Sequence, residues 1–304
     1  MRVVVHGDAH RVGVLDGDRV VDVNRAYADR VRHRGDAAEH VPSGLRDFIA
    51  AGEAALDRAR AAVEHAARTG AGVVPDPVLH APWPGKRIAC AGGNYAEHLR
   101  GMLDPEATLD EVTRRAREQG QWGFWKVPDR VPGDGGEVAV PARTACLDYE
   151  AEVAIVLRGN ARDVRPDDVA AHVWGITLAN DLSLRDEPRG TPRPMSYNLA
   201  KNFDGSIVLG PCILVGADPG GVDVETHVNG ELRQRFSTGD MVFSFAEIVA
   251  YLSRDLTLVD GDVVCGGTGA GTAADTRDPQ RFLRRGDTVS VRAETVGTLH
   301  TRIV

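Results

Sequence analysis

The sequence lacks the features that mark several large classes of protein. Its four cysteines, at positions 90, 146, 212 and 265, form no Cys-x-x-Cys pair, so neither a zinc site nor a disulfide framework is indicated. No basic run reaches five residues and the net charge is −8, which argues against nucleic acid as a partner. No stretch approaches the roughly 18 consecutive apolar residues of a membrane span, and the N-terminus has no apolar signal core. We therefore expect a cytoplasmic protein that binds neither nucleic acid nor a membrane.

What is present indicates a turn-rich, strand-rich protein of two parts. The chain has 304 residues, 42% of them hydrophobic, with 34 glycines and 16 prolines and no internal repeat. Four prolines crowd positions 75 to 84, as is typical of a linker. This composition predicts a small N-terminal domain at 1–80 and a larger catalytic domain at 81–304.

Short valine-rich strands separated by Gly7-Asp8 and Gly17-Asp18 are expected in the first 25 residues, followed by helices up to about residue 68. Beyond residue 137 the pattern is mainly strands, with one helix at 244–254 capped by Ser244. Strands dominate and do not alternate with helices, so the predicted class is α+β, mainly β, and not a doubly wound sheet. The expected strands are 137–141, 150–157, 173–179, 206–215, 222–228, 262–265, 288–294 and 297–303.

The candidate site begins with two glutamates beside a buried strand. Glu150 and Glu152 lie two residues apart, so in a strand they project to the same face, next to the apolar run 153–157. A second apolar strand, 173–179, ends at Asp181, which can add a third carboxylate. Paired carboxylates in low dielectric need a proton or a cation, and an all-oxygen set favours Mg²⁺, Mn²⁺ or Ca²⁺ over Zn²⁺. The alternative is a solvated strand edge with alternating charge.

A polar segment lies before this site. Thr108 and Glu111 form a capping box at the start of a helix with a thin apolar stripe, and the aromatic residues Trp122, Phe124 and Trp125 follow its end. The segment is interpreted as a lid over the site or as an ordinary surface helix.

Several motifs, in this order, resemble the fumarylacetoacetate hydrolase superfamily, in particular its fumarylpyruvate and acylpyruvate hydrolases. The match covers about residues 86–304. Its motifs include Gly92-Gly93-Asn94-Tyr95-Ala96-Glu97-His98, Leu147-Asp148-Tyr149-Glu150-Ala151-Glu152, Asn180-Asp181-Leu182-Ser183-Leu184-Arg185-Asp186, Lys201-Asn202-Phe203-Asp204-Gly205 and Thr268. The resemblance implies a mixed β-sheet roll, a homodimer and bound Mg²⁺ or Mn²⁺.

The resemblance also assigns roles to residues. It implies Glu150, Glu152 and Asp181 as metal ligands, Lys201 and the lid residue His98 as catalytic residues, and Thr268 and Arg185 as substrate-binding residues. Arg185 is also expected to pair with Asp186 or to support the metal site. An acidic partner for His98 can be Glu97, Asp104 or Glu106, and the sequence does not choose among them.

The implied substrate is a 2-oxo or β-diketo acid, and the leading hypothesis is metal-assisted hydrolysis of a C–C bond. The sequence departs from the family pattern in three places: Gly101 stands for a Glu, Pro188 stands for a Gln, and Gly266-Gly267-Thr268-Gly269 stands for Thr-Gly-Thr-Pro. The loss of the Glu favours the alternative of an isomerase or decarboxylase, which needs no attacking water. A non-catalytic binding protein is the third hypothesis, since fold does not fix function.

Overall fold

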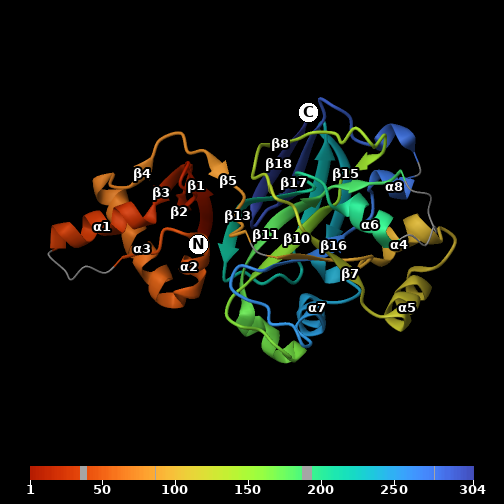
Figure 1. Cartoon of the computed structure of the whole chain (residues 1–304), viewed down its shortest axis with the longest axis horizontal. Helices are drawn as coiled ribbons and strands as arrows, with labels where there is room; N and C mark the ends of the chain where they lie inside the picture. The colour runs from red at the N-terminus through yellow and green to blue at the C-terminus, as the bar shows by residue number, and fades with distance from the viewer. Residues whose placement is uncertain (35–39, 86, 187–193, 277) are drawn as a thin grey trace.

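One long mixed sheet runs through the protein (Figure 1), in a computed structural model that describes residues 1–34, 40–85, 87–186, 194–276 and 278–304. Neighbouring strands are antiparallel except β16 and β6, which are parallel. In spatial order the strands are β4 (Val73–Val74), β3 (Arg19–Asp22), β2 (Arg11–Asp16), β1 (Arg2–His6), β13 (Ile207–Val215), β11 (Val173–Asp181), β10 (Ala151–Leu157), β16 (Val263–Thr268), β6 (Ile88–Ala91) and β7 (Gly123–Lys126), with β5 (Leu79–His80) paired to β1.

A second sheet packs against the central part of the first. Its order is β15 (Glu231–Ser237), β14 (Asp223–Val228), β17 (Thr288–Ala293), β18 (Gly297–Ile303) and β8 (Gly136–Val138), and a separate short pair joins β12 (Ser183–Leu184) to β9 (Leu147–Asp148). Every residue of β10 is buried, because Val153, Ile155 and Leu157 enter the core between the sheets while Ala154 and Val156 enter the core on the other face. The predicted mixed-sheet, mainly β class is confirmed.

The helices lie around the outside of these sheets and do not alternate regularly with the strands along the chain. They are α1 (Val23–Arg34), α2 (Leu45–Ala50), α3 (Gly52–Thr69), α4 (Ala96–Leu103), α5 (Leu109–Gln119), α6 (Pro194–Lys201), α7 (Phe245–Leu252) and α8 (Ala273–Thr276), with 3-10 turns η1 (Pro166–His172), η2 (Thr238–Asp240) and η3 (Pro279–Arg281). Two capping boxes are confirmed, Thr108 with Glu111 on α5 and Ser244 with Glu247 on α7. No helix of the described residues is long and apolar enough to cross a membrane.

The N-terminal strands extend the main sheet. β1 pairs with β13, with Arg2 opposite Leu214, so the segment drawn in red and orange at the left of Figure 1 is hydrogen-bonded to the rest of the molecule. The proline-rich stretch expected to be a linker contains β5, which pairs with β1 through Val5 and His80. The predicted domain boundary near residue 80 stays a prediction.

Several strands were not expected from the sequence: the short strands β4, β5, β7, β9 and β12, and the longer β15. β15 carries a charged residue at every second position from Glu231 to Arg235, and only Gln234 and Phe236 of this strand are buried, because it is an edge strand with one face in solvent.

Candidate active site

Three carboxylates meet where β10 begins and β11 ends. Glu150, Glu152 and Asp181 are all buried, and each offers an oxygen within 4.8 Å of the oxygens offered by the other two. Backbone pairing brings them together, because the N–H of Asp181 donates to the carbonyl of Glu150 at 2.8 Å and Glu152 lies opposite Ala179. The alternative of a solvated strand edge is therefore wrong.

Two lysines contact the carboxylate of Asp181, one at each oxygen. The Lys201 ammonium donates to Asp181 Oδ2 at 2.8 Å and also to Glu150 Oε2. Lys126, at the end of β7, lies 2.5 Å from Asp181 Oδ1 and donates to the carbonyl of Ser206 at 2.8 Å. Lys126 was not predicted from the sequence. Its position could have indicated it, because Lys126 follows Phe124 by two residues in a short aromatic strand, and residues two apart in a strand share a face.

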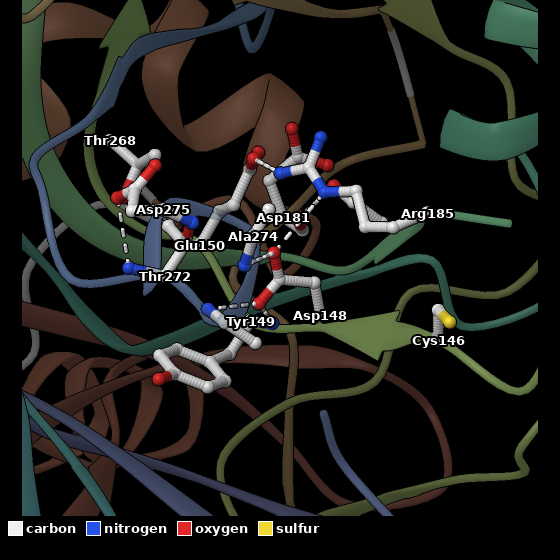
Figure 2. Close-up of polar contacts among 12 residues, drawn as sticks. Cys146, Asp148, Tyr149, Glu150, Asp181, Arg185, Thr268, Thr272, Ala274 and Asp275 are labelled. Atoms are coloured by element: carbon white, nitrogen blue, oxygen red, sulfur yellow. Dashed lines mark hydrogen bonds and ion pairs between the residues drawn. The ribbon is translucent and has the colours of Figure 1, made fainter. Parts of the chain in front are cut away.

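Arg185 forms the next part of this charge network (Figure 2). Its guanidinium donates to Glu150 Oε1 and, at 3.1 Å, to Asp148 Oδ2. Asp148 in turn accepts from the N–H groups of Ala273 and Ala274, at 2.8 and 3.1 Å, and so fixes the start of α8. Arg185 supports the site, as one of the sequence expectations had it, while Asp186 binds Thr144 and Ala145 instead of Arg185. A direct contact of Arg185 with substrate stays a prediction.

The three carboxylates differ in how their charge is compensated. Burial alone raises the pKa of Glu150, but Arg185, Lys201 and His98 outweigh it and lower that pKa. The pKa of Glu152 is raised, first by burial and then by the nearby Cys265, Asp181 and Glu150. Glu152 accepts the N–H of Gly267 at 2.8 Å, and no lysine or arginine of the described chain is ion-paired with it. Glu152 is thus the one carboxylate of the three without an ion-pair partner among the described residues, and Lys201 offsets the rise in its pKa only in part.

The environment of Glu152 indicates whether a metal ion fits this site. Buried carboxylates packed this closely are costly unless a cation joins them, and oxygen-only ligands suit hard divalent ions. The residues present therefore fit a divalent cation, which Glu150, Glu152 and Asp181 would hold.

Thr268 lies beside this cluster on β16. It is opposite Glu152 in the strand pairing, and its hydroxyl accepts a hydrogen bond from Gln234 Nε2 at 2.8 Å. Gln234 also accepts the N–H of Ala151 at 3.2 Å, so this buried amide joins β15 to the site. The sequence did not reveal Gln234, because the strand that carries it was not expected.

His98 is paired with an acid that sequence reasoning did not find. Its Nδ1 lies 2.9 Å from Asp275 Oδ1 and 3.1 Å from Oδ2, and both side chains are buried. Asp275 is held in turn by the N–H groups of Gly271 and Thr272, at 2.8 and 3.1 Å. Figure 2 shows Asp275 on the same side of Asp148 as Glu150.

The three expected acidic partners of His98 are wrong. Glu97 and Glu106 are exposed, and Asp104 is paired with Arg115 at 2.8 Å. Gly101 explains the replacement, because a Cβ at that position would lie 3.1 Å from Asp275 Cβ. The carboxylate missing at position 101 is thus supplied from α8, 177 residues along the chain from His98. Pro188, another of the departures, lies outside the described residues.

The aromatic residues after α5 do not form a separate flap. Gly123–Lys126 is β7, paired with β6, and the ring of Trp122 packs on Gly92. Phe124 faces the site, with Lys201 Nζ 4.9 Å from its ring centre. All three aromatic residues also line a cavity of about 280 Å³ next to α7. The predicted mobility of α4 and α5 stays a prediction.

The chain is similar to known proteins over most of its length. An oxaloacetate tautomerase of Bacillus subtilis (strain 168) is 31% identical over 302 residues, which is 95% of this chain and 94% of that protein. A solved fumarylacetoacetate hydrolase from psychrophilic Exiguobacterium antarcticum is 29% identical with a TM-score of 0.77, covering 100% of this chain and 99% of that chain. A solved 2-hydroxyhepta-2,4-diene-1,7-dioate isomerase from Mycobacterium marinum is 28% identical with a TM-score of 0.62, covering 76% of this chain and 80% of that chain.

A family described as "Fumarylacetoacetate (FAA) hydrolase C-terminal" matches residues 87–304. That range is more than half of the chain and contains the carboxylate cluster, both lysines and the His98–Asp275 pair. This protein therefore belongs to the fumarylacetoacetate hydrolase family.

Proposed function

We propose that this protein is a metal-dependent tautomerase that interconverts the keto and enol forms of a 2-oxo diacid such as oxaloacetate. The observation that carries the proposal is the buried His98–Asp275 pair beside a carboxylate cluster that fits a divalent cation. The sequence had placed C–C hydrolysis first, with isomerisation or decarboxylation as the alternative. The names of the similar tautomerase and isomerase favour the alternative.

The proton transfer is assigned to His98. Asp275 holds Nδ1, so Nε2 is the ring nitrogen left to exchange a proton with C3 of the substrate. In the enol-to-keto direction the hydroxyl on C2 loses its proton and C3 gains one, so no water is consumed. Asp275 fixes the tautomer of the imidazole and stabilises the imidazolium form.

The negative charge that develops on the C2 oxygen needs a positive environment. Mg²⁺ or Mn²⁺, held by Glu150, Glu152 and Asp181, would supply a Lewis acid for that oxygen. Lys201 contributes a second positive charge, since its ammonium already lies between Glu150 and Asp181. Thr268 and Arg185 are assigned to binding and orienting the substrate's carboxylates.

Hydrolysis is the second candidate, and one observation favours it. The His98–Asp275 pair restores the imidazole–carboxylate arrangement that the glycine at position 101 had put in doubt, and such a pair can also activate water. A solved relative of full-length similarity is named a fumarylacetoacetate hydrolase.

The test offers enol-oxaloacetate and an acylpyruvate to the purified protein, each with Mg²⁺, with Mn²⁺ and with EDTA. We expect the ultraviolet absorbance of the enol to decay faster than with metal alone, and Asp275→Asn to remove most of the gain. Two carboxylic acid products from the acylpyruvate would establish hydrolysis instead, and release of CO₂ from oxaloacetate would establish decarboxylation. If the protein converts neither compound faster than the metal ion alone does, the hypothesis of a non-catalytic binding protein would be favoured.

A further inference from the structure

Two helices of the N-terminal half bring two imidazoles onto one carboxylate. Asp29 and His33 are one turn apart on α1, and His65 lies on α3, which packs against α1. Figure 1 places α1 and α3 at the opposite end of the molecule from α4, α6 and α8, so this trio is separate from the carboxylate site.

The donor atoms of the trio converge. Asp29 Oδ2 lies 2.8 Å from His65 Nε2 and 3.2 Å from His33 Nδ1, and one atom from each residue lies within 4.8 Å of the other two. Ligand atoms bound tetrahedrally at about 2.0–2.1 Å from zinc are about 3.3 Å apart, so only a small opening of the trio would admit an ion. We propose that Asp29, His33 and His65 form a site for a late first-row divalent transition ion, best fitted by Zn²⁺.

The chemistry of the three ligands separates this site from the catalytic one. Imidazole nitrogens suit Zn²⁺, Cu²⁺ and Ni²⁺, whereas the catalytic set has only carboxylate oxygens and suits Mg²⁺ or Mn²⁺. The pKa of Asp29 is lowered, chiefly by its hydrogen bond with His65, so the carboxylate is an anionic ligand at neutral pH. His65 is buried and fixed, while His33 is 65% exposed, which leaves a fourth position open to water.

The surrounding charges act in both directions. His33 is in the last turn of α1, where the partial negative charge of the helix end favours a cation. Arg32 opposes a cation, but its guanidinium approaches the other oxygen of Asp29, Oδ1, at 3.3 Å and is mostly exposed. A bound zinc ion would link α1 to α3 and so stabilise the packing of these two N-terminal helices.

The experiment titrates Zn²⁺ into the metal-free full-length protein by calorimetry, in saturating Mg²⁺ so that the catalytic site is filled. We expect binding of one Zn²⁺ per chain, a rise in Tm of roughly 5 °C at 100-fold excess over Kd, and nitrogen hyperfine structure in the EPR spectrum when Cu²⁺ replaces Zn²⁺. His33→Ala should weaken Zn²⁺ binding at least about tenfold. Its side chain is exposed, so folding should be retained, and Mg²⁺-dependent tautomerase activity should not change.

A surface pair on β18 supplies the matched control. His300 Nδ1 lies 3.0 Å from Asp134 Oδ1 and is comparably exposed, but it belongs to no such trio among the described residues. His300→Ala should leave Zn²⁺ affinity unchanged. Equal Zn²⁺ affinity in the parent protein, His33→Ala and Asp29→Ala would overturn the proposal, as would a Cu²⁺ spectrum without nitrogen hyperfine structure. Either result leaves the proposed tautomerase activity untouched.

Discussion

Lys201 occupies the space between two of the carboxylates that a metal would share. Its ammonium contacts Glu150 and Asp181 at once, so it partly compensates their charge and also competes with an incoming cation. The carboxylates and Lys201 should therefore affect metal affinity in opposite directions.

Removing a carboxylate should weaken metal binding, and removing the ammonium should strengthen it. We expect Glu150→Ala and Asp181→Ala each to lower Mg²⁺ affinity at least about 100-fold, since each deletes an anionic ligand. Lys201→Met should raise Mg²⁺ affinity severalfold while lowering turnover. Calorimetric titration measures all three, and unchanged affinity in either carboxylate variant would remove that residue from the site.

Asp275 acts on the reaction through His98. Asp275→Asn should lower turnover roughly 100-fold, because an amide can neither stabilise the imidazolium nor enforce one tautomer. Mg²⁺ affinity should stay nearly constant, because Asp275 is not among the metal-ligand carboxylates. The variant Asp275→Ala combined with Gly101→Glu should recover part of the activity, since position 101 faces the space that Asp275 leaves. Full turnover in Asp275→Asn would assign the proton transfer to another residue.

At the scale of elements, charged groups replace apolar packing in two places. Asp22 ends β3, is completely buried, and accepts from Arg11 Nε at 2.7 Å and from the N–H of Arg25 at 3.0 Å in the first turn of α1. Helix α5 has only Val112 buried, and Arg117 ties it to Glu247 of α7 at 2.5 Å.

The buried ion pair of Asp22 with Arg11 makes the stability of the N-terminal strands and α1 depend on acidic pH. Burial raises the pKa of Asp22, but the hydrogen bonds from Arg11 and Arg25 outweigh it and lower the folded-state pKa. A lowered pKa stabilises the fold above the unfolded-state pKa, and this contribution is lost as the pH falls through the folded-state value. Asp22→Asn should cost about 2 kcal/mol at pH 7, and the difference from the parent should shrink between pH 5 and pH 3 in urea unfolding. Asp16→Asn, which breaks an exposed pair with Arg19, is the control and should change little.

Helices α4 and α5 should open easily. Exposed ion pairs contribute little to stability, so hydrogen exchange at residues 99–121 should be fast in the free protein. Exchange should slow when Mg²⁺ and oxalate are added together, as α4 carries His98. Amides of α3, which has a buried apolar stripe, provide the internal reference. Slow exchange at 99–121 before any ligand is added would mark the segment as a fixed part of the fold.

At the scale of the whole molecule, apolar side chains remain exposed beside the site. Val127 follows β7 and is 76% exposed, and Leu199 on the neighbouring α6 is 51% exposed. A contiguous exposed apolar patch marks a surface that another chain covers, and we expect these two side chains to form part of one.

We predict a homodimer, on the family resemblance together with this surface. Light scattering at micromolar concentration should give about twice the single-chain mass of 32.6 kDa. Val127→Asp should shift the protein toward the monomer if Val127 lies in the interface. A mass near 32.6 kDa for the parent protein would count against the dimer.

The sequence by itself determined the parts of this protein that depend on neighbours along the chain. Local geometry sets which face of β10 each side chain takes, and it places Glu150 and Glu152, two residues apart, on the same side. It also sets the capping boxes of α5 and α7. The end of the apolar strand 173–179 added Asp181 as a third carboxylate, and the family motifs added Lys201. The structure brings all four residues together.

Only the tertiary structure decided which distant groups complete the site. Asp275 reaches His98 across 177 residues because Asp148 fixes the start of α8. Lys126 of β7 reaches Asp181 of β11 although β10, β16 and β6 separate these two strands in the main sheet. The same holds for β1, whose pairing with β13 makes the N-terminal strands part of that sheet. Side-chain period and capping are set within a few residues, whereas these partners are set by the order in which strands pair, which no local pattern contains.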